Sequence, residues 1–421
     1  MKVLVVGSGA REHALAWKLA ASPQVEELYA APGNPGMARV ADCVPIRADA
    51  IVELADFAES LKVDLTVVGP ELPLVLGIRD EFERRGLRLF GPTRRAAEVE
   101  GSKAFTKRLC QNYGIPTAPG EVVSSRQQAA EVASKLGLPV VFKADGLAAG
   151  KGVLVCRTEE ELDEALERFF ERREFGAAGE RVVVEACLSG EELSFLVVTD
   201  GKSVWPLPAA RDYKRLRDGD QGPNTGGMGA FSPAPLSREL ASTVLSQVIY
   251  PALKALAHEG RWYQGVLYAG LMLTADGPKL LEFNCRLGDP EAQVILPRLG
   301  GDIAPALLAV ARGEMGSPEI TVERQASACV VLASRGYPQA PETGHPISGV
   351  EEAEASGALV FHAGTAMADG QLVTAGGRVL SVVGVAGSLR EAVDKAYRAA
   401  EQVRFEGVQF RRDIGRGFVD G

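Results

Sequence analysis

The chain opens with an apolar strand, a glycine turn and a helix pattern, an order that few folds accommodate. Lys2 to Val6 is the strand, Gly7 and Gly9 form the turn, and helical periodicity follows directly. Further strands of this kind are expected at residues 27–31, 65–68 and 87–90. Short strands that alternate with helices form a parallel sheet covered on both faces. The sequence therefore predicts an N-terminal doubly wound parallel α/β domain, residues 1–101.

The same turn raises the question of dinucleotide binding. The fingerprint requires G-x-G-x-x-G or G-x-G-x-x-A and an acid about 20 residues further on. Here Glu12 stands at the third position, and the second strand, residues 27–33, ends without an acid. NAD and FAD are therefore disfavoured. A glycine turn at a helix N-terminus still favours phosphate, so an anion site is predicted, with a ligand-free turn as the alternative.

Bulk properties exclude several classes of protein. A formal net charge of -9 argues against nucleic acid as the main partner, because phosphate backbones call for a basic surface. We expect no apolar run near the roughly 18 residues of a membrane helix, and no signal peptide, since the N-terminus enters a strand. The six cysteines are scattered without a CxxC pair, which favours a reducing cytoplasm and neither zinc nor disulfides.

A glycine-rich loop, KADGLAAGKG at residues 143–152, lies between two predicted strands, residues 138–143 and 153–156. Glycines allow a backbone to approach phosphate oxygens closely, and lysines supply positive charge. The loop is no Walker A motif, because Gly152 stands where Ser or Thr is required. We predict a phosphate-binding flap between strands; a flexible hairpin turn is the alternative.

A second segment, LLEFNCRLGDPE at residues 280–291, ends an apolar strand with alternating polar residues. Glu282 and Asn284 share one face of that strand, and Mg²⁺ accepts a few protein oxygens beside substrate phosphates. Arg286 follows on the same side and would place a cation near those phosphates. The alternative, a solvated strand face, is disfavoured because Phe283 and Cys285 form an apolar opposite face.

Residues 211–235 are polar, rich in Gly and Pro, and without clear periodicity. A loop of this length inside a compact protein is usually functional or disordered. Asp212, Lys214 and the glycines at 226 and 227 suit a small zwitterion, whose carboxylate would meet cations or backbone N–H groups and whose amine would meet acids. A disordered loop is the alternative.

Taken together, these segments resemble the ATP-grasp ligases, and among them the phosphoribosylamine–glycine ligase family. The resemblance spans essentially the whole chain through GSGAREHALAWK, VVGPELPL, GSKAFTK, KADGLAAGKGV, VVVEACLSGEE, PNTGGMGAFSP, LEFNCRLGDPE and FRRDIG. It implies a central ATP-grasp domain at residues 102–326, with a small lid subdomain at about 122–190. It also implies a small mixed α/β domain at 327–421.

The resemblance further implies a two-step reaction of purine biosynthesis. Glycine carboxylate attacks the γ-phosphate of ATP to give glycyl phosphate and ADP, and the amine of 5-phosphoribosylamine then displaces phosphate. The implied cofactors are ATP with Mg²⁺ or Mn²⁺, and the implied protein is a cytoplasmic monomer. Such chemistry needs positioning and charge neutralisation and no nucleophilic side chain.

Site residues follow from the resemblance, position by position. For ATP they are Lys103, Lys143, Gly150, Lys151, Gly152, Glu185, Ala186, Leu188 and Glu192, with Glu191 as the alternative ribose ligand. For the metal they are Glu282 and Asn284. For glycine they are Asp212, Asn224, Gly226 and Gly227, and for phosphoribosylamine they are Gly9, Arg11 and Glu71. Arg286 and Asp212 are the implied catalytic pair.

Two positions depart from the family pattern. Ala10 replaces a usual third glycine and tolerates positive φ poorly, and Tyr213 stands where His is common, so no proton transfer is assigned there. Two other functions stay open. Another ATP-grasp ligase, a carboxylase or formyl-phosphate-type purine enzyme, would share the ATP half. A non-catalytic nucleotide sensor would not need the metal pair or Arg286.

Overall fold

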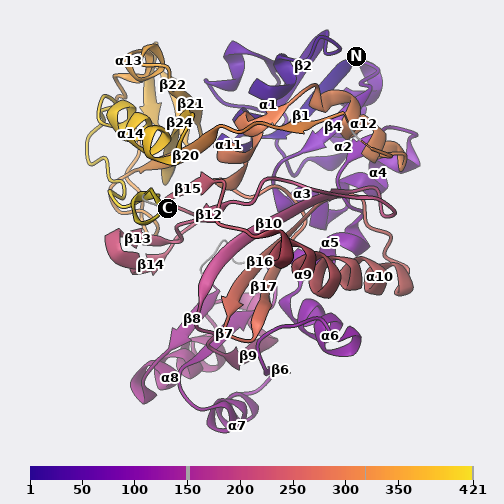
Figure 1. Cartoon of the computed structure of the whole chain (residues 1–421), viewed down its shortest axis with the longest axis vertical. Coiled ribbons are helices and arrows are strands. Elements are labelled where there is room, and N and C mark those ends of the chain that lie inside the picture. Colours follow the sequence, from indigo (N-terminus) through magenta and orange to yellow (C-terminus); the bar gives the residue numbers. More distant parts are fainter. Residues whose placement is uncertain (148–151, 318, 420–421) are drawn as a thin grey trace.

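The computed structural model describes residues 1–147, 152–317 and 319–419. The N-terminal domain is a parallel sheet in the order β3-β2-β1-β4-β5 (Figure 1). Its strands are β1 (Lys2–Gly7), β2 (Glu27–Pro32), β3 (Asp42–Cys43), β4 (Leu65–Val68) and β5 (Leu89–Phe90). Its helices are α1 (Ala10–Ala20), α2 (Ile51–Ser60), α3 (Glu71–Leu76) and α4 (Ile78–Arg84). The predicted doubly wound sheet is confirmed, and the chain order reverses between β1 and β4, where such sheets bind ligands.

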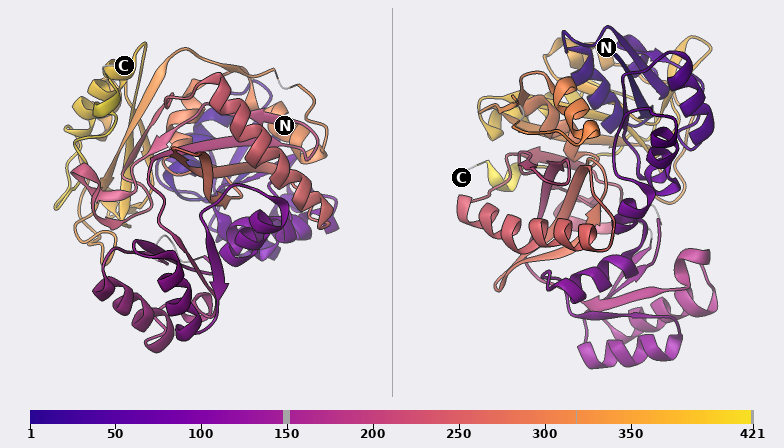
Figure 2. Two further views of the ribbon diagram at one scale, coloured as in Figure 1. Left: turned by 60° about the horizontal axis from the view of Figure 1, so that its bottom comes forward. Right: turned by 90° about the vertical axis from the view of Figure 1, so that its right-hand side faces the viewer.

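A lid follows the N-terminal domain and has its own hydrophobic core around Phe142 and Phe169. Two helices lead into it, α5 (Arg94–Gly101) and α6 (Lys103–Tyr113). The lid sheet is antiparallel in the order β6 (Gly120–Val123), β9 (Val182–Ala186), β7 (Val140–Ala144) and β8 (Val153–Cys156). It carries helices α7 (Arg126–Leu136) and α8 (Glu159–Leu166). In Figures 1 and 2 the lid lies apart from the N-terminal domain, across the central strands.

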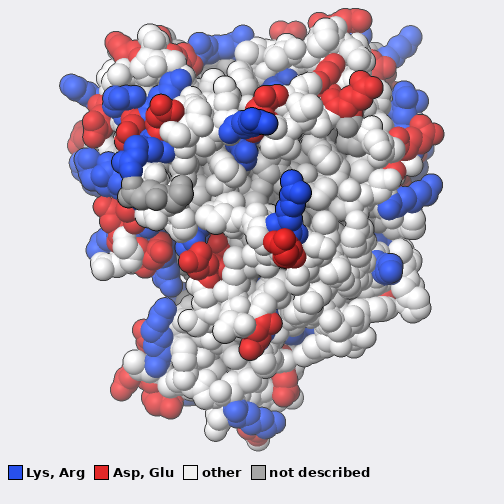
Figure 3. All heavy atoms as spheres, in the orientation of Figure 1, with Lys and Arg blue, Asp and Glu red and all other residues white. Residues whose placement is uncertain are grey.

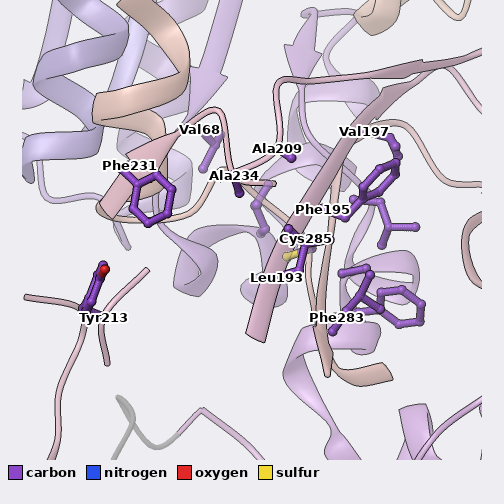
Figure 4. Packing of buried hydrophobic residues seen from close by; sticks show 14 of the residues in the cluster. Val68, Leu193, Phe195, Val197, Ala209, Tyr213, Phe231, Ala234, Phe283 and Cys285 are labelled. Carbon is purple, nitrogen blue, oxygen red and sulfur yellow. The ribbon is translucent and has the colours of Figure 1, made fainter. Parts of the chain in front are cut away.

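The central sheet carries the polar residues of the site on one face. Its order is β11 (Val204–Pro206), β10 (Glu191–Thr199), β16 (Gly265–Thr274) and β17 (Gly277–Asn284). Strand side chains alternate, so Leu193, Phe195 and Phe283 pack together on the opposite, buried face with Cys285 (Figure 4). The predicted apolar face behind Glu282 and Asn284 is therefore confirmed.

A third sheet joins the segment at 211–235 to the C-terminal domain. Its order is β12 (Arg211–Asp212), β15 (Gly229–Ser232), β20 (Ala326–Ala333), β24 (Arg378–Ala386) and β21 (Leu359–His362). The same segment also forms the hairpin of β13 (Arg215–Arg217) and β14 (Gln221–Asn224). The expectation of an irregular loop was thus wrong for these strands, because β15 takes its hydrogen bonds from β20, about 100 residues further along the chain.

The remaining elements complete the layers around these sheets. Helices are α9 (Arg238–Val244), α10 (Tyr250–His258), α11 (Glu291–Ile295), α12 (Ile303–Arg312), α13 (Val350–Ala355) and α14 (Leu389–Ala400). Two short hairpins are β18 (Leu299–Gly300) with β19 (Thr321–Val322), and β22 (Thr365–Ala368) with β23 (Gln371–Thr374). On the face shown in Figure 3, Lys and Arg are interspersed with Asp and Glu around a large uncharged area.

One continuous helix, Arg238–His258, is long and apolar enough by composition to cross a membrane, with a mean hydropathy of 1.3. This differs from the expectation that no such run exists. Val248, Ala252 and Leu256 are buried against the core, whereas Glu239 and Lys254 are exposed. Buried residues at spacings of four on one face are typical of a helix that packs on a protein core.

Candidate active site

A cleft of about 990 Å³ lies between the lid, the central sheet and both terminal domains. It brings together most of the predicted residues: Arg11, Glu71, Lys103, Lys143, Gly152, Glu185, Ala186, Leu188, Glu192, Asp212, Asn224, Gly226, Glu282, Asn284 and Arg286. Gly9 and Gly227 are not among the described lining residues, and Gly150 and Lys151 fall outside the described residues. Segments far apart in the sequence thus form one site.

A buried carboxylate, Glu185, organises the lysines at the lid end of the cleft. It forms an ion pair with Lys143, and its other oxygen lies 2.6 Å from Lys107 Nζ. Lys143 also donates to Leu281 O at 2.9 Å, and Lys103 donates to Gly146 O at 3.3 Å at the start of the loop between β7 and β8. Sequence analysis missed Lys107, although it follows Lys103 by one helical turn on α6.

Removing the charge of Glu185 is expected to destabilise the fold. In Glu185→Gln, two largely buried lysines lose their shared counter-ion, and an uncompensated buried charge costs about 3 kcal/mol in the free energy of unfolding. Urea unfolding monitored by circular dichroism measures this loss. Glu121→Gln, an exposed carboxylate on β6 of the same sheet, is the matched control. Equal urea midpoints for the two variants would contradict the role of Glu185 as the counter-ion of the two lysines.

The predicted metal pair lies at the end of β17, where Glu282 and Asn284 face the cleft. Burial opposes the ionisation of Glu282, but Lys214, Lys103 and other nearby cations outweigh it and lower the pKa of this carboxyl. Within the described part of the chain, no three His, Cys, Asp or Glu side chains cluster as a metal site. One carboxylate and one amide oxygen fit Mg²⁺, which takes its other ligands from phosphates and water.

Arg286 stands beside this pair and is fixed by two carboxylates. Its guanidinium lies 2.8 Å from Glu100, 3.2 Å from Glu71 and 3.3 Å from Asn284 Oδ1. Although burial opposes ionisation, Arg286 and Arg11 outweigh it and hold the pKa of Glu71 at about 2, whereas burial raises the pKa of Glu100. Sequence analysis missed Glu100, because a single acid on a helix carries no motif.

The first glycine turn is filled by the chain's own Glu12. Its carboxylate accepts from Gly9 N at 2.6 Å and from Arg11 Nε at 2.6 Å. A Cβ at Gly69 would lie 2.0 Å from its Oε1. The N–H group of Gly9 is therefore not free to bind an anion, contrary to the prediction for this turn. The cation near the turn that lines the cleft is Arg11. Ala10 is the first residue of α1 and is not among the residues with positive φ, so the alanine side chain causes no backbone strain there.

A second group of acids surrounds Lys214 between the lid and the C-terminal domain. Lys214 Nζ lies 3.1 Å from Glu192 and 3.8 Å from Glu282. Burial, aided by Glu291, Glu192 and Glu282 and opposed by Lys214, raises the pKa of Asp212 to about 8. Acidic side chains thus outnumber basic ones around Lys214, and such a surplus of negative charge suits a bound cation.

The C-terminal domain holds the predicted glycine loop from both sides. Gly226 N donates to the Tyr337 hydroxyl at 2.9 Å, and Arg378 donates to Gly226 O at 2.6 Å and to Asp289 Oδ2 at 2.8 Å. Neither Tyr337 nor Arg378 was found from the sequence, because their partners lie more than 80 residues away.

Tyr213 connects the segment at 211–220 to the C-terminal end of the chain. Its hydroxyl accepts from Gly415 N at 2.9 Å, and the Arg411 guanidinium lies over its ring at 4.7 Å. Arg411 also forms ion pairs with Asp413 and Asp220. The C-terminal FRRDIG motif thus anchors the segment at 211–220.

Comparison with known proteins matches nearly the whole chain to one protein family. Three family models match: the N domain of phosphoribosylglycinamide synthetase at residues 1–100, its ATP-grasp (A) domain at 101–292 and its C domain at 327–417. The phosphoribosylamine–glycine ligase of Halalkalibacterium halodurans is 49% identical over 99% of this chain and 96% of its own. That of Ralstonia nicotianae is 49% identical over 99% of both.

Solved structures agree with the fold. The crystal structure of phosphoribosylamine–glycine ligase from Thermotoga maritima has a TM-score of 0.86 and 38% identity, and covers 98% of this chain and 100% of that one. A biotin carboxylase domain from Hydrogenobacter thermophilus, solved with MgADP and bicarbonate, has a TM-score of 0.71 at 20% identity over 97% of this chain and 91% of that one. The latter shows a shared fold alone.

One cleft is lined by the lid, by the lysines that pair with Glu185, and by the oxygen pair of Glu282 and Asn284. These features define an ATP-grasp ligase, a class that uses ATP with a divalent metal. Arg11, Glu71 and Gly226 of the glycine loop line the same cleft. The chain belongs to the phosphoribosylamine–glycine ligase family, a family of ADP-forming ligases of purine biosynthesis.

Proposed function

We propose that this chain joins glycine to 5-phosphoribosylamine through glycyl phosphate and releases ADP and phosphate. The observation that carries this proposal is that one cleft is lined by Lys103 and Lys143, by the oxygen pair Glu282 and Asn284 with Arg286, and by Arg11 with Glu71. A nucleoside triphosphate, a small carboxylate and a sugar phosphate fit this set of charged and polar groups.

In the proposed reaction, Lys103 and Lys143 hold the ATP phosphates and residues 143–152 cover them. Ala186 and Leu188 contact the adenine edge, and Glu192 binds the ribose. Glu282 and Asn284 would hold Mg²⁺ or Mn²⁺, which would supply positive charge to neutralise the phosphates.

The chain's own residues then complete the acyl transfer. Arg286 stabilises the transferring phosphoryl group with a fixed cation, while Asp212 and the loop at 224–227 orient glycine. Arg11 and Glu71 bind phosphoribosylamine so that its amine reaches the acyl carbon. We also propose domain boundaries near 101 and 326, a lid at about 122–190, and a cytoplasmic monomer with no nucleic-acid or membrane partner.

Release of ADP from purified protein with ATP and Mg²⁺ tests the proposal when glycine and freshly made phosphoribosylamine are added separately and together. We expect turnover only with both. Turnover with another carboxylate or amine would keep the ATP-grasp class and overturn the substrates. ATP binding without turnover under any combination would favour the nucleotide sensor.

Arg11→Ala and Glu71→Ala are expected to raise the KM for phosphoribosylamine. Loss of one charge-assisted hydrogen bond corresponds to about tenfold or more in affinity. The KM values for ATP and glycine, measured in the same assay, should stay unchanged. An unaltered KM for phosphoribosylamine in both variants would refute the placement of this substrate.

The apparent affinity for glycine is expected to depend on pH through Asp212. Burial raises the pKa of this carboxyl to about 8, so the free protein carries it protonated below that pH and ionised above it. An ammonium group binds the ionised form, so the KM for glycine should fall as the pH rises toward about 8. Asp212→Asn should flatten this dependence; a parallel pH profile in the variant would contradict it.

A further inference from the structure

Asp145 is a buried carboxylate at the end of strand β7 to which the proposed reaction assigns no role. It is 9% exposed and is not among the described residues that line the cleft. Its Oδ1 accepts from Ser102 Oγ at 2.7 Å and from Ala104 N at 3.0 Å, and its Oδ2 lies 2.7 Å from the Arg181 guanidinium. All three contacts are with the protein, so an effect of Asp145 on a ligand must act through other residues.

Two of these contacts fix Asp145 to the first turn of helix α6. Ser102 is the N-cap of α6, and Ala104 is the second residue of the helix. The first N–H groups of a helix have no partner within it, and the positive end of the helix dipole attracts a carboxylate. Since β7 belongs to the lid and α6 precedes the lid, Asp145 joins these two parts of the molecule.

The same turn of α6 carries Lys103, a lysine that lines the cleft. Its Nζ donates to Gly146 O at 3.3 Å, one residue beyond Asp145. Ser102 and Ala104, the neighbours of Lys103 in the chain, both donate to the Asp145 carboxylate. A lysine side chain has many rotamers, so its ammonium group keeps one place only if the backbone beneath it is fixed. Asp145 fixes that backbone relative to the carbonyl that the ammonium group contacts.

The backbone of residues 145 and 146 is fixed from the lid side. Asp145 N donates to Ala178 O at 2.7 Å and to Arg181 O at 3.1 Å. Gly146 has a φ of +141°, and a Cβ at this position would lie 3.1 Å from the Cβ of Ala178. Residues other than glycine rarely adopt such a φ, so the chain leaves β7 along a path that requires glycine.

We propose that Asp145 is a positioning residue for phosphate binding, which fixes Lys103 against the start of the glycine-rich loop. The inference rests on the proposed function, in which Lys103 holds the phosphates of ATP. Loss of the Asp145 carboxylate should therefore weaken binding of the triphosphate and leave binding of the adenine and ribose groups unchanged.

The experiment measures, by equilibrium dialysis, the affinity of the protein for two ligands. One is the Mg²⁺ complex of a non-hydrolysable ATP analogue, and the other is adenosine, which has no phosphate. In Asp145→Ala we expect the affinity for the analogue to fall by about tenfold or more, with the affinity for adenosine unchanged. Asp145→Asn should recover most of the loss, because the amide oxygen still accepts from Ser102 and Ala104.

Arg181→Ala is the matched control. It removes the ion pair on the other oxygen of Asp145, and the Arg181 side chain is 52% exposed. Exposed ion pairs contribute little, so both affinities should stay near those of the wild type. A loss as large as that of Asp145→Ala would assign the effect to the ion pair and overturn the role of the contact with α6.

A double variant tests whether Asp145 acts through Lys103. Once Lys103→Ala has removed the ammonium group, the further change Asp145→Ala should cause no additional loss of affinity for the analogue. Effects that pass through one group are not additive, whereas those of independent groups are. Equal losses from Asp145→Ala with and without Lys103 would overturn the inference.

Ser102→Gly covers the case in which Asp145→Ala does not fold. Glycine is tolerated as an N-cap, so this variant removes one donor to Asp145 and keeps the carboxylate. We expect the affinity for the analogue to fall by about threefold or more, with the affinity for adenosine unchanged. A wild-type affinity for the analogue in this variant would overturn the inference.

The same measurements separate failure of the inference from failure of the proposed function. If the wild-type protein does not bind the analogue, the proposed function fails and the inference fails with it. If the wild-type protein binds the analogue and Asp145→Ala keeps that affinity, the inference alone fails. It also fails alone if Asp145→Ala weakens both ligands equally, because the carboxylate then supports the fold in general.

Discussion

Arg286→Met is expected to lower kcat by about a few hundredfold, because a preorganised charge near the transferring group contributes roughly 3–4 kcal/mol to catalysis. The structure explains why this cation is preorganised. Glu71 and Glu100 bind the guanidinium from two sides, and burial of the group is outweighed by these acids, which raise its pKa. Arg286 therefore stays charged and fixed before any substrate arrives.

The control for this prediction is Arg286→Lys, which keeps the charge and loses the planar fork. We expect this variant to recover part of kcat. Its single ammonium group should not bind Glu71 and Glu100 at the same time, as the guanidinium does. Because Glu100 would be left buried without its partner, thermal melts of both variants must accompany the rates. A folded Arg286→Met protein with a kcat near that of the wild type would remove Arg286 from the catalytic assignment.

Glu282→Gln is expected to raise the Mg²⁺ concentration that gives half-maximal rate and to lower kcat by about a hundredfold or more, because metal binding contributes several kcal/mol of charge stabilisation. Titration of Mg²⁺ and of Mn²⁺ in the ADP-release assay measures both effects. The effect should exceed that of Asn284→Ala, since a neutral amide attracts a divalent cation less strongly than a carboxylate does.

Glu192→Gln provides the comparison that separates metal binding from general charge. Both Glu192 and Glu282 pair with Lys214, so each variant removes one acidic partner of that lysine, but only one of them removes a proposed metal ligand. An identical Mg²⁺ dependence in the two variants would contradict the metal assignment.

The sequence predicts local features of this fold well where the signal lies within one element. The strands at 65–68 and 153–156 are confirmed residue for residue. Glu282 and Asn284 were placed on one face by alternation alone, and the buried side chains of Phe283 and Cys285 confirm the opposite face.

What the sequence does not predict depends on contacts between distant segments. The sequence of β15 shows no strand periodicity. It is a strand because it pairs with β20, which lies about 100 residues further along the chain. Lys107 and Glu100 acquire a role only when α5 and α6 lie beside the lid and β17. Glu12 replaces a fingerprint glycine, and only the structure shows its carboxylate in the place where a bound phosphate would otherwise accept from Gly9.

The third sheet has a consequence for attempts to dissect or recombine the protein. A chain cut after residue 326 would lose β24 and most of β20 and expose the backbone of β15 as a bare edge. Exposed sheet edges promote association between molecules. The C-terminal segment is therefore no detachable module: a chimaera that exchanges it must exchange β12 and β15 as well, although they lie about 100 residues earlier in the chain.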